Sequence, residues 1–174
     1  MPSPKLVPEN VIVSDATVLI NFLETNSLGI LIKTFSGRLH ITDVVRGEIK
    51  HHHGELTKAI EAKQIMVHEV TIDEVKHLEK SYSNLHAGEA SCIELAREKS
   101  WRVATDDGTA KGIIAKVLNP SYVVTTFDIL LEAVRLGLMK KGEVQPLLTK
   151  MEQQASFIYN EDEHKRFQVQ LRSY

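Results

Sequence analysis

The 174-residue sequence contains a single cysteine, Cys92, and almost no excess charge of either sign. One cysteine cannot form a disulfide within the chain, which excludes a disulfide-stapled secreted domain and favours a reducing compartment, the cytoplasm. Twenty-one Lys and Arg residues against 23 Asp and Glu residues give a net charge of −2, so no overall positive field attracts nucleic acid. A polyanionic partner must therefore be bound through a local patch or a metal ion.

The sequence also lacks a long apolar run. The longest candidate, Val11 to Leu23, is interrupted by Asp15 and Asn21 and is too short to cross about 30 Å of hydrocarbon. The first ten residues include three prolines and no apolar stretch, so neither a signal peptide nor a membrane segment is expected.

Several motifs of well-known enzyme classes are missing as well. The sequence contains no phosphate-binding P-loop, no dinucleotide glycine fingerprint, no His-Glu-x-x-His helix and no paired Cys-x-x-Cys. These absences argue against nucleotide-driven enzymes, enzymes with a Rossmann cofactor and zinc enzymes.

What is present is typical of one globular domain. Hydrophobic residues make up 43% of the chain and charged residues 25%, close to the averages for folded domains. A chain of this length buries roughly two-thirds of its unfolded surface around one core. We therefore expect a single domain over 1–174, with an extended N-terminus at 1–10, a core at 11–137 and a C-terminal helical extension at 138–174.

Five short runs rich in β-branched residues alternate with segments of helical periodicity. The runs are Val11 to Ser14, Leu39 to Thr42, Ile65 to Val70, Arg102 to Thr105 and Tyr122 to Thr125. Such alternation predicts a parallel sheet with right-handed crossovers and helices on both faces. We expect a three-layer α/β/α domain whose five strands have the order 3-2-1-4-5.

Apolar spacing and capping residues place the helices. They are expected around Val18 to Leu23, from Thr42 or Asp43 to Ile49, over Gly54 to Ala62, Thr71 to Tyr82 and His86 to Lys99, from Thr126 to Leu136, and beyond Gly142. The segment from 160 to 174 forms either a docked helix or a mobile tail.

Acidic residues follow the predicted strands, where ligands bind in open α/β sheets. Asp15 follows the first run, and Asp106 and Asp107 follow the fourth. Glu48 and Glu89 each share a helix face with apolar residues, which predicts that the Glu48 carboxylate points inward. Clustered carboxylates repel one another unless a cation neutralises them, and Mg²⁺ or Mn²⁺ prefers such oxygen ligands. The pattern therefore favours metal-dependent phosphodiester cleavage.

Four segments carry a resemblance to the successive motifs of the PIN-domain nucleases. They are Val13-Ser14-Asp15-Ala16-Thr17-Val18-Leu19-Ile20, Asp43-Val44-Val45-Arg46-Gly47-Glu48-Ile49, Leu85-His86-Ala87-Gly88-Glu89-Ala90 and Thr105-Asp106-Asp107-Gly108-Thr109-Ala110-Lys111. The stretch from Leu130 to Leu138, with Glu143 to Leu148, is similar to the tail of a prokaryotic subfamily related to VapC-like toxins. The resemblance covers most of residues 11 to 170.

The resemblance implies a Mg²⁺- or Mn²⁺-dependent endoribonuclease acting on single-stranded or structured RNA. Its implied catalytic residues are Asp15, Glu48, Glu89 and Asp107, and its metal ligands are the same four residues together with Asp106. The doublet leaves open which aspartate is the ligand. The implied partners are RNA, a small antitoxin protein and a second copy of the chain in a homodimer.

Thr17, Thr105, Arg46 and Lys111 flank the acidic motifs and are the candidate substrate contacts. Each also has a structural interpretation, because a threonine at a strand end satisfies backbone groups and exposed cations are usually solvated. Asp128 either joins the acidic cluster or stabilises a helix N-terminus. The alternative function is a catalytically inactive PIN-like scaffold that binds RNA or protein.

Overall fold

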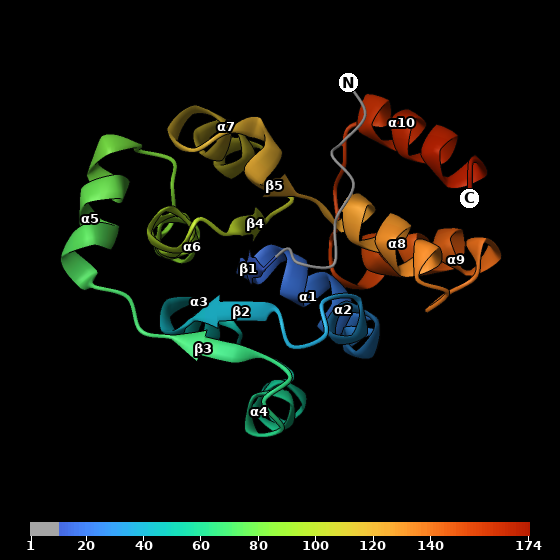
Figure 1. The fold of residues 1–174 in the computed structure, drawn as a ribbon, viewed down its shortest axis with the longest axis horizontal. Helices are drawn as coiled ribbons and strands as arrows, with labels where there is room; N and C mark the ends of the chain where they lie inside the picture. The colour runs from blue at the N-terminus through green and yellow to red at the C-terminus, as the bar shows by residue number, and fades with distance from the viewer. Residues whose placement is uncertain (1–10) are drawn as a thin grey trace.

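The fold, seen in a computed structural model that describes residues 11–174, is built on a five-stranded parallel sheet (Figure 1). The strand order β3-β2-β1-β4-β5 confirms the predicted order 3-2-1-4-5. The strands are β1 Ile12–Ser14, β2 Leu39–Thr42, β3 Met66–His68, β4 Arg102–Ala104 and β5 Val123–Val124. The expected extended segment 1–10 lies outside the described residues.

The strand β2 has the predicted bounds, whereas the other four strands are shorter than the β-branched runs suggested, because neighbouring polar groups take other partners. The Ile65 amide donates to the Ala59 carbonyl oxygen at 3.4 Å, and the Val70 amide donates to the Asp43 carboxylate at 3.3 Å. Before β5, Pro120–Tyr122 forms the short 3₁₀ helix η1. Hydrogen bonding therefore limits β3 and β5 more than β-propensity does.

Helices cover both sides of the sheet. They are α1 Ala16–Glu24, α2 Leu28–Thr34, α3 Asp43–Glu48, α4 His53–Glu61, α5 Ile72–Ser81, α6 Ala87–Lys99, α7 Gly108–Val117, α8 Thr126–Arg135, α9 Lys141–Gln154 and α10 Glu161–Arg172. Figure 1 places α5 and α6 on one side and α1, α2, α8 and α9 on the other. This arrangement is the expected three-layer α/β/α architecture. Helix α2 was not predicted from the sequence.

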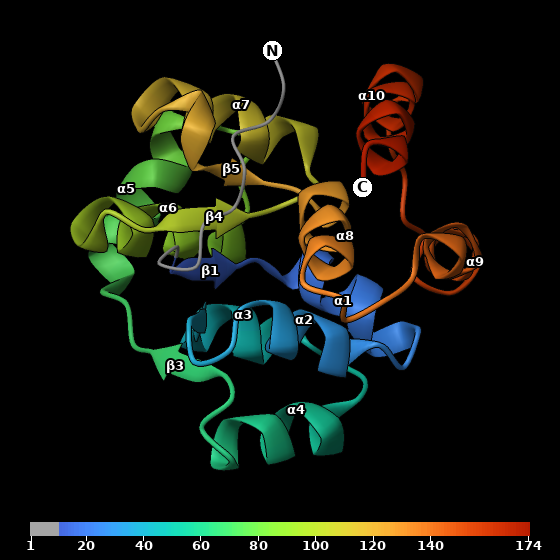
Figure 2. The same ribbon diagram turned by 45° about the vertical axis from the view of Figure 1, so that its right-hand side comes forward.

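The C-terminal segment is docked rather than loose. Helix α9 packs on α1, and α10 packs on α8 (Figure 2). Phe127 of α8 stacks on Phe167 of α10 with ring centroids 4.6 Å apart, and Phe157 and Tyr159 join the same cluster. Burial of these aromatic rings accounts for the docking. Of the two alternatives for residues 160–174, the docked helix is therefore correct.

Four helices that follow strands begin close to the strand ends and are capped by polar side chains. Asp15 caps α1, Thr42 caps α3, Asp107 caps α7 and Thr125 caps α8, each by accepting a hydrogen bond from a backbone amide of the first turn. The cap of α8 is Thr125 rather than the expected Thr126. Capping thus positions two of the candidate acids at the carboxyl edge of the sheet.

Candidate metal-binding and active site

Asp15 lies in the middle of this edge, after the central strand β1, and is 1% exposed. Its Oδ1 accepts hydrogen bonds from the Val18 amide at 3.0 Å and the Thr17 hydroxyl at 2.8 Å. Its Oδ2 is buried and accepts no well-formed hydrogen bond from any described residue. A buried carboxylate oxygen without a partner is costly, so this atom marks a place where a cation would be stabilising.

Burial raises the pKa of Asp15 from its ordinary 3.8 to about 7. The hydroxyls of Thr105 and Thr17 and the Val18 amide oppose this rise, and the nearby charge of Asp106 adds to it. Removal from water disfavours the ionised form more than these donors favour it. Without a cation, Asp15 is therefore only partly ionised near neutral pH.

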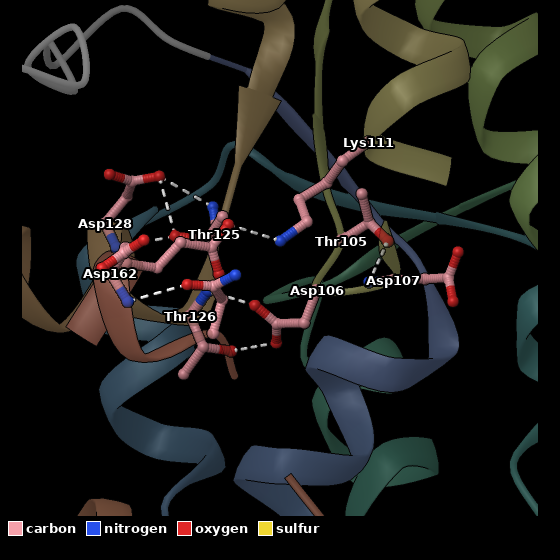
Figure 3. Close-up of polar contacts among 10 residues, drawn as sticks. Thr105, Asp106, Asp107, Lys111, Thr125, Thr126, Asp128 and Asp162 are labelled. Atoms are coloured by element: carbon pink, nitrogen blue, oxygen red, sulfur yellow. Dashed lines mark hydrogen bonds and ion pairs between the residues drawn. The ribbon is translucent and has the colours of Figure 1, made fainter. Parts of the chain in front are cut away.

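Asp106 and Asp107 follow β4 but point in opposite directions (Figure 3). The carboxylate of Asp106 is fully engaged: Oδ1 accepts from the Thr126 amide at 2.8 Å, and Oδ2 accepts from the Thr126 hydroxyl at 2.5 Å and Asn21 Nδ2 at 3.0 Å. Among the described residues, the Asp107 carboxylate accepts only the cap bond from the Ala110 amide, at 2.8 Å through Oδ1. The contacts favour Asp107 as the member of the doublet with a ligand oxygen to spare.

Burial also raises the pKa of Asp106, to about 6. The two bonds from Thr126 and the charge of Lys111 limit the rise, while Asp128 adds to it. Asp106 therefore connects β4 to the start of α8 and to Asn21 of α1, a structural role.

Glu48 is the last residue of α3 and is exposed, so the expected inward orientation is wrong. The helix ends there because Ile49 turns to an extended conformation, which breaks the helical face that the spacing implied. Instead, Glu48 Oε1 accepts a hydrogen bond from the Gly88 amide at 3.0 Å, in the first turn of α6. The positive end of α6 therefore holds this carboxylate in place.

The close approach of Glu48 requires a glycine at position 88. A Cβ atom there would lie 2.3 Å from Glu48 Oε2 and 2.7 Å from Oε1. Sequence reasoning missed this contact, although Gly88 belongs to the third of the four motifs.

Glu89 is half-buried in the first turn of α6, where its Oε2 accepts the His86 amide at 3.0 Å in a capping box. Burial raises the pKa of Glu89, and the charges of Asp107 and Glu48 raise it further. Glu48, Glu89 and Asp107 therefore interact electrostatically, although they lie on α3, on α6 and after β4. Like charges held together in this way favour a bound cation.

The four candidate substrate contacts have different roles in the structure. The Thr17 hydroxyl holds Asp15, and the buried Thr105 hydroxyl accepts the Asp107 amide at 3.2 Å, so both position acids. Arg46 is exposed on α3, two residues before Glu48. Lys111 forms an ion pair with Glu163 of α10 at 2.9 Å, which connects α7 to the C-terminal helix.

Asp128 acts at the start of α8. Its Oδ2 accepts from the Thr125 amide at 2.9 Å and from the Thr125 hydroxyl at 3.0 Å, as the other half of a capping box. These contacts favour the helix-stabilising interpretation of Asp128 over membership of the acidic cluster.

The donor set fits a hard divalent cation, although its ligands are not gathered at one point. Among residues 11–174, no three His, Cys, Asp or Glu side chains are arranged to hold an ion. Asp15 nevertheless has a buried oxygen without a partner, and one oxygen each of Glu48, Glu89 and Asp107 is engaged by a backbone amide. Because a single hydrogen bond holds each of these three carboxylates, the second oxygen of each acid is left to bind a cation.

The parallel α/β/α fold thus brings acids that follow β1 and β4, and acids of α3 and α6, to one edge of the sheet. A comparison with protein families matches residues 11–172 to the PIN domain. The chain therefore belongs to the PIN-domain family, whose members are typically nucleases that use divalent metals. No curated protein and no solved structure matches the chain.

Within residues 11–174, no helix is long and apolar enough to cross a membrane.

Proposed function

We propose that this protein is a Mg²⁺- or Mn²⁺-dependent endoribonuclease that cleaves single-stranded RNA. The observation that carries the proposal is the buried Oδ2 of Asp15 at the centre of the acidic edge, which accepts no well-formed hydrogen bond from residues 11–174. Membership of the PIN-domain family supports nuclease activity in general. The choice of metal and of RNA rests on the oxygen-only donor set and on the motifs in the sequence.

Asp15, Glu48, Glu89 and Asp107 would hold the metal ion. When bound, the ion would neutralise charge on the scissile phosphate and lower the pKa of a water molecule. The chain contributes positioning: Thr17 orients Asp15, the Gly88 amide orients Glu48, and the His86 amide orients Glu89. Supporting contacts of this kind keep ligands in place between turnovers.

The proposed biological role is that of the toxin in a toxin–antitoxin pair, with a small antitoxin protein as inhibitor. The resemblance of residues 130–138 and 143–148 to the tail of a prokaryotic subfamily related to VapC-like toxins supports this role. A second copy of the chain is a further proposed partner. Copurification of a small protein encoded beside this gene, and its inhibition of cleavage, would test the role.

Conservative acid substitutions test the activity directly. Asp15→Asn and Glu89→Gln keep the shape of each side chain and remove one negative charge, so folding should be retained. Cleavage of a single-stranded oligoribonucleotide with Mn²⁺ should fall by about 100-fold or more, because a weakened metal site lowers transition-state stabilisation. The measurement is the initial cleavage rate of purified protein, stripped of any copurifying partner.

Glu143→Gln, which changes an exposed helix-capping acid of α9, is the matched control and should cleave like the wild type. Equal residual cleavage by the wild type and both acid variants would indicate a contaminating ribonuclease. A wild type that binds RNA but cleaves none with Mg²⁺ or Mn²⁺ would favour the inactive scaffold.

A further inference from the structure

A cavity of about 390 Å³ adjoins the acidic edge on the side of the C-terminal segment. Thr17, Asp106 and Asp107 line one side of it, and the connection between α9 and α10, Ala155 to Ile158, lines the other. Its volume lies in the range of about 300 to 1,000 Å³ that is usual for small-ligand sites. The cavity therefore lies directly beside the proposed reaction site.

The C-terminal wall is held firmly. Phe157 is 6% exposed, and both Phe157 and Tyr159 pack against Phe127 of α8. Ile158, between them, is 84% exposed and belongs to the lining of the cavity. Ile20 of α1 provides a second apolar side chain in the same lining. The cavity thus offers two aliphatic surfaces on a rigid support.

The remaining lining is polar and does not favour an anion. The described residues that line the cavity include two aspartates and no lysine or arginine, so a phosphate group would be repelled. Asn21 Nδ2 donates to Asp106 and Thr126, whereas no described residue donates to Asn21 Oδ1. A neutral, flat ligand with apolar faces and a polar edge matches this combination, and a nucleobase has that chemistry.

We infer that this cavity binds one nucleobase of the RNA strand, next to the phosphate that is cleaved. Ile158 and Ile20 would contact the faces of the base, and Asn21 would face its edge. The inference rests on the proposed endoribonuclease function and adds a subsite to it. Because residues 155–158 line one side of this cavity, the C-terminal extension contributes to substrate binding as well as to stability.

Substitution at Ile158 tests the subsite with little risk to folding, since the side chain is mostly exposed. Binding of a fluorescent single-stranded oligoribonucleotide is measured by anisotropy in EDTA, where a metal-dependent enzyme cannot cleave. Ile158→Ala should raise the Kd about fivefold to tenfold, because it removes most of one apolar wall. Ile158→Trp should lower the Kd by stacking on the base. Ile72→Ala is the matched control, because Ile72 is 66% exposed on α5 and does not line the cavity.

Oligoribonucleotides with a single abasic position identify the base. At one position, loss of the base should weaken binding to the wild type about as much as Ile158→Ala does. At that position the abasic change should not weaken binding to the Ile158→Ala variant any further. The subsite would be overturned if the abasic change and Ile158→Ala weakened binding additively at every position. It would also be overturned if Ile158→Ala bound RNA with wild-type affinity, or if the wild type bound no oligonucleotide.

The two proposals fail in different ways. Binding that depends on Ile158 without any cleavage in Mn²⁺ would leave the subsite and remove the endoribonuclease activity. Cleavage with a KM that Ile158→Ala does not change would leave the activity and remove the subsite.

Discussion

The acidic edge has two regions that hold their carboxylates differently. In the aspartate region, Asp15 and Asp106 follow the strands β1 and β4, and burial raises the pKa of both. In the glutamate region, Glu48 and Glu89 lie at the end of α3 and the start of α6, where backbone amides of α6 and its cap anchor them. In the first region, burial disfavours the ionised form of both aspartates. The second region is more open to solvent, and the position of Glu48 there depends on Gly88.

This difference indicates how a cation would act on each region. Contact of the ion with Asp15 would stabilise a buried carboxylate, so metal binding should be coupled to stability through this residue. The contribution of Glu48 and Glu89 to metal binding should depend on side-chain placement more than on stability. Three predictions test the comparison, from the largest expected effect to the smallest.

The largest effect concerns pH and stability without metal. Asp15 has a pKa of about 7 in the folded protein and an ordinary value of 3.8 when unfolded. Between these values the folded state binds the extra proton, so the free energy of unfolding should decrease as pH rises from about 4 to 7, by several kcal/mol at most. Urea unfolding in EDTA at a series of pH values measures the decrease.

Asp15→Asn should reduce this pH dependence and leave the smaller part that comes from Asp106, whose pKa is about 6. Mn²⁺ should stabilise the wild type near pH 7 more than it stabilises Asp15→Asn. Asp162→Asn, at an exposed position in α10, is the control and should keep the wild-type slope. An Asp15→Asn variant with the wild-type slope would show that burial of this acid has no consequence for stability.

The second prediction concerns the glycine of the glutamate region. Gly88→Ala should displace the exposed Glu48 carboxylate, because the new Cβ would lie 2.3 Å from Oε2. Folding should be unaffected or slightly favoured, since alanine is the better helix former by up to about 1 kcal/mol. Mn²⁺-dependent cleavage should fall about 10- to 100-fold, as for other lost supports of a metal ligand.

Melting temperature and cleavage rate together check this result. Gly112→Ala in α7 is the matched control, because a Cβ there meets nothing within 4 Å and should leave cleavage unchanged. If Gly88→Ala cleaved like the wild type, the position of Glu48 would not matter for activity.

The smallest effect separates the neighbouring aspartates. Asp106→Asn cannot accept all the bonds from Thr126 and Asn21, so the free energy of unfolding should fall by about 1 to 3 kcal/mol. Asp107→Asn keeps a good helix cap and should change stability little while it lowers cleavage. Urea unfolding and cleavage assays on both variants check the assignment. The opposite pattern would make Asp106 the ligand.

Local signals in the sequence were sufficient for the strand order and for the strand-end acids. Asp15 and Asp107 cap helices through bonds to amides three residues away, so their placement follows from a short stretch of chain. The parallel order of the five strands followed from alternation of strand and helix and from the need to bring Asp15 near the other acids. Both kinds of signal act over short distances or through simple periodicity.

Contacts between distant segments were decided only by the tertiary structure. The bond from Gly88 to Glu48 spans 40 residues, the bond from Thr126 to Asp106 spans 20, and the ion pair of Lys111 with Glu163 spans 52. The choice between Asp106 and Asp107, the exposure of Glu48 and the docking of α10 all depend on such contacts. A side chain's partner at that separation is set by how whole elements pack, and sequence spacing does not encode it.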